Sequence, residues 1–291
     1  MISPENVGIV YNSQTPQAKT LAHQLADSLG LGEASWIVPA YEGERPEPPS
    51  ALSLIITVGG DGTILWTTQI VAPRGIPILG VNLGRVGFMT ELGPEEALTR
   101  LGEYLNGDTW IEERTMLQAR ILPEEAPGPE VGPFHALNEV VVGRRAISRL
   151  VHLEARVNGA TVTAYRADAV IVATATGSTG YSLSVGGPIL HPQSRDLLVQ
   201  PVAPHLGLAA ALVLPQESVV EITLRSERPA VVSIDGRGEM DLAQGQRVEI
   251  RRGPYTARFL RANPPGHFYT TLTRRLKIYS DVSAPPPPSS P

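Results

Sequence analysis

The sequence predicts two domains: an α/β domain with a Rossmann-like open parallel sheet, followed by an all-β, β-sandwich-like domain. Apolar runs alternate with helical patterns over about the first 115 residues, as in a β-α-β fold. Beyond that point, short alternating runs are separated by turn signals such as Asn158-Gly159 and Asp235-Gly236. The chain has 291 residues, of which 42% are hydrophobic, so it is long enough for two domains.

The α/β half is expected to begin with a strand and then to alternate. A helix starts at Thr15-Pro16, and Gly30 marks its end. A second helix follows the third strand, and a third begins at Pro94. The predicted strands are residues 7–11, 34–38, 54–58 and 76–81. Ligands of such sheets bind at the carboxyl ends of the strands, where Asp61 falls.

The β half is expected to hold at least seven short strands. They are residues 116–122, 134–142, 150–157, 169–174, 219–224, 230–234 and 247–250. We therefore place the α/β nucleotide-binding domain at residues 1–115, completed by residues 270–282, and the all-β NAD-binding domain at residues 116–269. Residues 284–291 are Pro-rich and predict a disordered tail.

Composition excludes several kinds of chemistry. The formal net charge of −5 gives no indication of a nucleic-acid partner. Lys19 and Lys277 are the only lysines, and neither lies in a G-x-x-x-x-G-K-[ST] P-loop. The absence of cysteine excludes disulfides, thiolate catalysis and zinc-cysteine sites. The sequence shows no signal peptide and no apolar stretch long enough for a bilayer, so we expect no membrane association and a cytoplasmic location.

A glycine-rich turn is the first indication of function. Gly59-Gly60-Asp61-Gly62-Thr63 follows an apolar strand and precedes the apolar start of a helix. Backbone amides and the positive end of a helix dipole then meet at one point, which favours phosphate binding. A carboxylate repels phosphate. Asp61 is therefore consistent with a site that holds a phosphate and also orients a hydroxyl that attacks it. The alternative is a capped connection, with Asp61 or Thr63 as the helix N-cap.

Four further segments combine glycine with polar groups. Each alone has a structural alternative, namely a turn, the end of a loop, or a surface loop. They are Asn82 to Phe88 after the fourth strand, Asn138-Glu139, the stretch from Asp168 through Thr174 to Pro188, and Ile234-Asp235-Gly236-Arg237. In the third of these, hydroxyls and bare amides suit ribose and phosphate, and Tyr181 offers a face for a base.

Taken together and in this order, these segments resemble the NAD kinase family, the ATP-dependent NAD 2′-phosphotransferases. The resemblance covers roughly residues 7–278, and the stretch from Thr176 to Ser184 is its most specific part. The glycine turn is shared more widely, with relatives that phosphorylate lipids or sugars. Many family members have Pro and Ala where this chain has Ala175 and Gly180.

The resemblance implies the activity and its residues. The γ-phosphoryl group of ATP would pass to the 2′-hydroxyl of the adenosine ribose of NAD, with a divalent cation, Mg²⁺ by expectation, and with Asp61 as the proton acceptor. The phosphate-binding residues would be Gly59, Gly60, Gly62 and Thr63. The NAD-binding residues would be Asp61, Gly62, Phe88, Asn138, Glu139, Arg149, Arg166, Asp168, Thr179, Gly180, Tyr181, Ser182, Leu183, Ser184 and Arg237.

No protein ligand for the metal is identified from the sequence. The family also implies a homodimer or homotetramer. Two rival functions remain, a lipid or sugar kinase of the same superfamily and a non-catalytic dinucleotide-binding or sensor protein. A NAD-dependent dehydrogenase is disfavoured because no G-x-G-x-x-G follows a strand.

Overall fold

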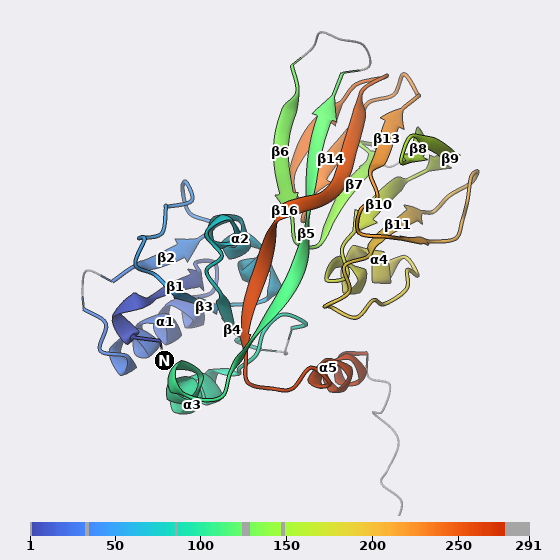
Figure 1. Ribbon diagram of the computed structural model, residues 1–291. Helices are drawn as coiled ribbons and strands as arrows, with labels where there is room; N and C mark the ends of the chain where they lie inside the picture. The colour runs from blue at the N-terminus through green and yellow to red at the C-terminus, as the bar shows by residue number, and fades with distance from the viewer. Residues whose placement is uncertain (1, 33–34, 85–86, 124–128, 147–148, 277–291) are drawn as a thin grey trace, which may run out of the picture.

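The structure is a computed structural model that describes residues 2–32, 35–84, 87–123, 129–146 and 149–276. The predicted tail and residues 277–282 of the predicted α/β completion lie outside these ranges. Within the described ranges, no helix is long and apolar enough to cross a membrane. An α/β half and a β-sandwich half stand side by side, which confirms the predicted fold class (Figure 1).

Four parallel strands with helices on both faces form the α/β half. In sheet order the strands are β2 (Ile37–Ala40), β1 (Val7–Asn12), β3 (Leu54–Val58) and β4 (Ile78–Val81). The helices are α1 (Pro16–Ser28), α2 (Asp61–Val71) and α3 (Pro94–Asn106), with 3₁₀ turns η1 (Pro4–Asn6) and η2 (Ala72–Arg74). Side chains alternate across β3, so Ile56 packs with α1 and α3 on one face, while Ile55 packs with α2 on the other.

Two long antiparallel strands run from one half of the molecule into the other. They are β5 (Trp110–Leu122) and β16 (Arg247–Arg261). The last residues of β16 pair with β4 through Phe259 and Ile78, and its first residues pair with β13 (Val220–Leu224). Both halves therefore share one continuous sheet, and the predicted domain boundary between residues 115 and 116 falls inside β5 (Figure 1).

The sandwich consists of the upper part of this sheet and a second sheet of six strands. The remaining strands of the first sheet are β6 (Val131–Ala136), β8 (Val151–Val157) and β9 (Ala160–Ala167). The second sheet has the order β12 (Leu212–Leu214), β11 (Leu197–Val202), β10 (Ala169–Ala173), β7 (Glu139–Arg144), β14 (Ala230–Ile234) and β15 (Arg237–Leu242). Inward-facing residues of both sheets, such as Leu153 and Val172, are buried in one core.

Several elements differ from the sequence-based prediction. The second strand of the α/β half is β2, residues 37–40, and not residues 34–38, and strands β9, β11, β12 and β15 have no predicted counterpart. The predicted strand at residues 134–142 is wrong, because the chain forms two strands, β6 and β7, that belong to different sheets. Residues 116–122 and 247–250 are only parts of β5 and β16. The extension of β5 was missed because the buried Glu112 and Arg114 hide the apolar alternation expected of a strand, and that of β16 because residues 251–254, Arg-Arg-Gly-Pro, interrupt it.

Candidate active site

The glycine turn after β3 leads directly into α2. Gly60 is the N-cap, Asp61 is the first helical residue, and no side chain caps the helix. The alternative in which Asp61 or Thr63 is the N-cap is therefore wrong. A Cβ atom on Gly59 would lie 2.3 Å from the Oγ1 of Thr63, so only glycine fits there. Since the first amides of a helix have no intrahelical acceptor, this turn presents donors and the positive dipole end to an anion.

The loop after β4 wraps around the carboxylate of Asp61. The amide of Phe88 donates to its Oδ2 at 3.2 Å, and the amide of Met89 donates to its Oδ1 at 3.3 Å. A Cβ atom on Gly87 would lie only 2.1 Å from Oδ1. The close approach of this loop therefore depends on glycine. The carboxylate is held by backbone groups while its side chain remains 25% exposed.

Asp235 holds the Asn138-Glu139 segment in place. Its carboxylate accepts hydrogen bonds from the amides of Leu137, Asn138 and Glu139 at 2.8, 2.7 and 3.1 Å. These bonds turn the chain between β6 and β7. The sequence predicted Asp235 only as part of a hairpin turn, because the three amides that it binds lie almost 100 positions earlier in the chain.

Glu139 is a buried carboxyl group with an unused acceptor. Its Oε2 has no hydrogen-bond partner among the described residues. Burial, followed by the nearby charge of Asp235, raises the pKa of Glu139 to about 7. Gly180 passes close to this oxygen, since a Cβ atom there would lie 3.0 Å from Oε2. Glu139 therefore faces the glycine-rich segment with one oxygen that is buried and lacks a hydrogen-bond partner among the described residues.

The stretch from Thr176 to Ser184 packs on Asn138-Glu139. It forms η3 (Gly177–Thr179) and α4 (Tyr181–Ser184). Gly177 sits against the backbone of Asn138, where a Cβ atom would lie 2.1 Å from the carbonyl oxygen. Ser182 is buried, whereas Tyr181 and Ser184 are exposed; Thr179, Gly180 and Leu183 are half-buried. An exposed aromatic ring thus stands beside the half-buried Asn138 and the buried Glu139.

Arg237 connects the sandwich to the glycine turn. Its Nη2 donates to the carbonyl oxygen of Gly62 at 2.6 Å, and its guanidinium lies 4.8 Å from the ring centre of Tyr41. Arg237 also lines a cavity of about 400 Å³ that contains Arg45 and Asp235. Through Arg237 and Asp235, the structure brings the glycine turn, Asn138-Glu139 and the α4 segment into one region.

Three predicted site residues lie elsewhere. Asp168 pairs with Arg144 at 2.9 Å, at the end of β10 away from Glu139. Arg166 and Arg149 are exposed near that same end. With about 3.3 Å per residue along a strand, Asp168 is separated from the Glu139 level by roughly 16 Å. This chain does not bring them next to Asp61, and their predicted contact with NAD stays a prediction.

α5 (His267–Arg275) contacts both halves of the molecule beside Asp61. Its Arg275 pairs with the Oδ2 of Asp61 at 3.2 Å and lies over the ring of Phe88 at 4.2 Å. Phe268 contacts Phe88 of the α/β half and His191 of the sandwich half, with ring centres 6.5 and 5.5 Å apart. Arg275 was not predicted as a site residue, because nothing in its neighbourhood in the chain indicates the contact with Asp61.

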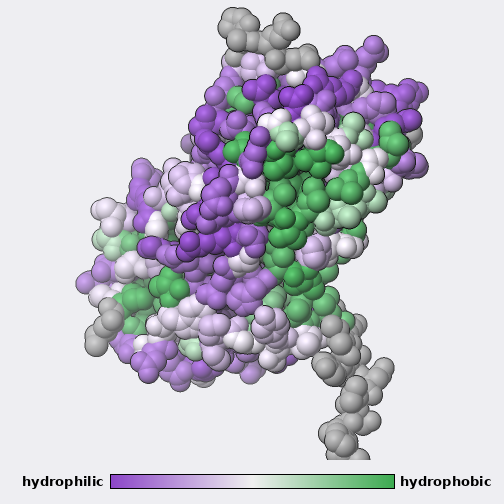
Figure 2. Space-filling view, turned by 45° about the vertical axis from the view of Figure 1, so that its right-hand side comes forward, coloured by the Kyte–Doolittle hydropathy of each residue, from purple (hydrophilic) through white to green (hydrophobic). Residues whose placement is uncertain are grey.

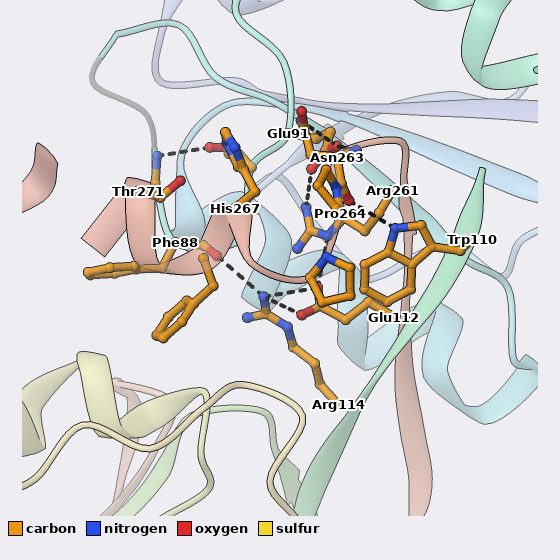
Figure 3. A pocket seen from close by; sticks show the side chains of 14 residues that line it. Phe88, Glu91, Trp110, Glu112, Arg114, Arg261, Asn263, Pro264, His267 and Thr271 are labelled. Carbon is orange, nitrogen blue, oxygen red and sulfur yellow. Dashed lines mark hydrogen bonds and ion pairs between the residues drawn. The ribbon is translucent and has the colours of Figure 1, made fainter. Parts of the chain in front are cut away.

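A small cavity of about 50 Å³ lies behind the Gly87–Met89 turn, between that turn, β5 and the start of α5. Figure 3 shows four charged side chains from its lining, which point toward one another. They are Glu91, Glu112, Arg114 and Arg261, and none is more than 7% exposed. The sequence contains one signal for this cluster. Glu112 and Arg114 lie two positions apart, so both side chains occupy inward-facing sites of the same strand.

Comparisons with known proteins identify the relatives of the chain. Residues 40–109 match the family model of the ATP-NAD kinase N-terminal domain, and residues 137–262 match that of the ATP-NAD kinase C-terminal domain. An NAD kinase of Dehalococcoides mccartyi is 41% identical over 275 residues, covering 94% of this chain and 96% of the relative. An NAD kinase of Chloroflexus aggregans is 38% identical over 276 residues, covering 94% and 99%.

Solved structures show the same fold. The yeast NADH kinase complexed with NADH superposes with a TM-score of 0.80 at 23% identity, covering 97% of this chain and 89% of that one. An NAD kinase from Archaeoglobus fulgidus in complex with ATP gives a TM-score of 0.72 at 26% identity, covering 92% and 97%. The family predicted from the glycine turn and the Thr176 to Ser184 stretch is confirmed: the chain belongs to the NAD kinase family and is an enzyme that phosphorylates NAD with ATP.

Proposed function

We propose that Asp61 receives the proton of the 2′-hydroxyl of the adenosine ribose of NAD as the γ-phosphoryl group of ATP is transferred to that oxygen. One observation carries this role. Asp61 is a partly exposed carboxylate at the start of α2, where phosphate binding is favoured, and two backbone amides fix its position. Phosphoryl transfer depends mostly on positioning and charge stabilisation, so a fixed acceptor suits it.

The acceptor side of the site is assigned to the sandwich half. We propose that Asn138, Glu139 and the segment Thr179, Gly180, Tyr181, Ser182, Leu183 and Ser184 bind the adenosine part of NAD. The buried oxygen of Glu139 without a partner suits a ribose hydroxyl, and the 42% exposed ring of Tyr181 offers a face to adenine. Phe88 and Arg237 border the same region.

The donor side is assigned to the glycine turn. Gly59, Gly60, Gly62 and Thr63 would hold ATP phosphates at the start of α2, with the amides of Gly60 and Gly62 as donors, because the amides of Gly59 and Thr63 donate to the carbonyl oxygens of Val81 and Gly60. Arg45 and Arg237 stand beside this turn, and neither forms an ion pair among the described residues, so they place positive charge next to an anionic substrate. These residues supply the phosphate contacts that a P-loop lysine provides in other enzymes.

A divalent cation, Mg²⁺ in our proposal, would reach the site with ATP. Among the described residues, no group of three or more His, Asp or Glu side chains could hold a metal ion. Mg²⁺ in phosphotransferase sites commonly binds phosphate oxygens and keeps waters, so this donor set is compatible with a phosphate-borne ion. When bound, it neutralises charge on the phosphates, whereas the steps assigned to Asp61 belong to the chain itself.

An oligomer is also proposed, as a homodimer or homotetramer. Figure 2 shows apolar side chains gathered on one face of the molecule. The segment that joins β11 to β12, together with β12 itself, exposes Leu206, Leu208 and Val213 by 61, 37 and 49%, and β12 is an edge strand. Exposed apolar groups at a sheet edge favour self-association. Light scattering of the purified chain measures its mass in solution and tests this proposal. A cytoplasmic location also stays a prediction.

The test of the proposed roles is an assay with NAD, ATP and Mg²⁺ in which an NADP-specific dehydrogenase detects the product. Asp61→Asn is expected to bind NAD with unchanged affinity and to lose about 10²–10⁴-fold in kcat, the contribution typical of a general base. Near-normal turnover by a folded Asp61→Asn enzyme would refute the role of Asp61.

A further inference from the structure

The four buried charges behind the Asp61 loop have no part in the roles described above. Arg261 donates to Glu112 at 2.8 Å and to Glu91 at 3.1 Å, and Arg114 donates to Glu112 at 3.1 Å. Burial opposes ionisation of Glu112, but Arg114 and Arg261 outweigh burial and hold the pKa of Glu112 below its usual range. The cluster combines two basic and two acidic side chains, so its formal charges balance.

Stability alone is a weak reason for such a cluster. Removing ions from water costs several kcal/mol per ion, and replacing a buried ion pair by apolar residues of similar volume is often neutral or stabilising. Phe259, which lies within 5.0 Å of both guanidiniums and is itself buried, shows that apolar side chains fit at this place. The charges therefore call for a second explanation.

The two arginines bind the same loop that holds Asp61, from its opposite side. The Nη2 of Arg114 donates to the carbonyl oxygen of Phe88 at 3.4 Å, and the Nη1 of Arg261 donates to the carbonyl oxygen of Met89 at 3.0 Å. The amides of these same residues, Phe88 and Met89, donate to the carboxylate of Asp61. Figure 3 shows Arg114 directed at the Phe88 carbonyl oxygen from the cavity side.

One peptide unit links Arg114 and Asp61 directly. The carbonyl of Phe88 and the amide of Met89 belong to the same planar trans peptide, so they point in opposite directions. The carbonyl accepts from Arg114, and the amide donates to Asp61. A cation on the carbonyl fixes the rotation of this peptide and polarises its N–H, which makes it a better donor to the carboxylate.

We propose that Arg114, supported by Glu112 and Arg261, is a positioning residue for the phosphoryl transfer: it fixes the Phe88-Met89 peptide, which in turn orients the carboxylate of Asp61 toward the acceptor hydroxyl. This inference rests on the proposed role of Asp61. It predicts an effect on kcat that disappears when Asp61 can no longer act as a proton acceptor.

The experiment is a double-mutant cycle in the intact enzyme. Glu112→Leu with Arg114→Met removes one charge of each sign and leaves Arg261 paired with Glu91, so the fold is expected to survive. In the wild-type background, kcat is expected to fall about 10–10²-fold, as for a small misplacement of a catalytic group. In the Asp61→Asn background, the same change is expected to alter the residual kcat less than about twofold. Calorimetric stoichiometry of NAD binding counts the folded molecules in each sample.

A matched control lies one residue along the same strands. Glu113 and Arg258 form an exposed pair at 3.1 Å that does not touch the loop. Glu113→Gln with Arg258→Gln is expected to leave kcat within about twofold of wild type, because exposed pairs contribute little.

Three results separate the outcomes. An unchanged kcat in folded Glu112→Leu, Arg114→Met enzyme overturns the inference, and so does an equal fall in both backgrounds, which indicates a structural role. Normal turnover of Asp61→Asn overturns the role of Asp61 itself, whatever the cluster does. If the double substitution does not fold, Arg114→Lys keeps the charge balance but loses the planar fork, and the same cycle with this variant decides between the same outcomes.

Discussion

Asp61 and Glu139 are the two carboxyl groups at the centre of the site, and they have contrasting surroundings. Asp61 belongs to the α/β half, is 25% exposed, and accepts hydrogen bonds from two backbone amides and from Arg275. Glu139 belongs to the sandwich half, is 6% exposed, and has one oxygen without a partner. The described contacts of Asp61 fix the direction of its carboxylate, whereas Glu139 is buried and has one acceptor oxygen without a partner.

These different surroundings indicate different roles for the two halves of the molecule. A carboxylate that must meet a reacting hydroxyl needs a fixed direction and access, and backbone donors at a helix start provide both. A carboxyl group that recognises a ligand can be buried at some cost in stability, because the ligand supplies the missing hydrogen bond. Asp61 accordingly fits the chemical step, and Glu139 fits recognition of the substrate.

After Asp61→Asn itself, the largest expected effect on turnover comes from a change in the loop around Asp61. Gly87→Ala places a Cβ atom 2.1 Å from the Oδ1 of Asp61, so the carboxylate must move. We expect kcat to fall about 10²-fold with little change in melting temperature, since the clash is with a side chain at the edge of the site. Gly84→Ala is the control, because its Cβ atom would meet nothing within 4 Å. Equal kcat for the two variants would contradict this account of the loop.

The next effect concerns stability and separates Glu139 from Asp61. An acid whose pKa rises from its ordinary value of 4.5 to about 7 on folding holds its proton longer in the folded state. The free energy of unfolding should therefore fall as pH rises from about 4.5 to 7, and the penalty is complete above that window. Glu139→Gln is expected to remove about 3 kcal/mol of this loss.

Urea unfolding at pH 5 and pH 8 measures this effect. Glu139→Gln should be more stable than wild type at pH 8 and differ less at pH 5. Some pH dependence is expected to remain, because burial also raises the pKa of Asp235 to about 6. The exposed Glu227 provides a control, and Glu227→Gln should behave as wild type at both pH values. Parallel curves for Glu139→Gln and wild type would contradict the buried, raised-pKa assignment.

The smallest expected effect tests whether Asp61 needs its ion pair. Arg275 is 42% exposed, and exposed pairs contribute about 0–1 kcal/mol. Arg275→Gln is therefore expected to change kcat less than about fivefold, with Arg274→Gln, its exposed neighbour on α5, as control. A loss as large as that of Gly87→Ala would show that the ion pair, rather than the backbone amides, positions the carboxylate.

Local patterns predicted much of this molecule. The apolar run before Gly59 predicted the buried strand β3, and the glycines after it predicted a turn into a helix at the correct place. The helix from Pro16 ends one residue before its predicted limit, at Ser28. These elements were accessible because strand periodicity, helix starts and glycine turns depend on neighbours in the chain.

Contacts between distant segments were not accessible in this way. Asp235 was predicted as a turn residue, yet it binds three amides of the Asn138-Glu139 segment. Arg275 reaches Asp61 from 214 positions away, and Arg114 reaches Phe88 across the shared sheet. Strands such as residues 110–115 were missed because a buried Glu112 and Arg114 interrupt the apolar alternation that identifies a strand.

The sequence by itself determined the fold class, the glycine turn with Asp61 inside it, and the family to which the chain belongs, since each depends on residue types at fixed spacing. Only the tertiary structure decided what surrounds Asp61. The shared strands β5 and β16 join the two halves, Arg237 ties the sandwich to the glycine turn, and a buried ionic cluster supports the loop from behind. The physical reason is that the direction of a side chain depends on groups that only folding brings together.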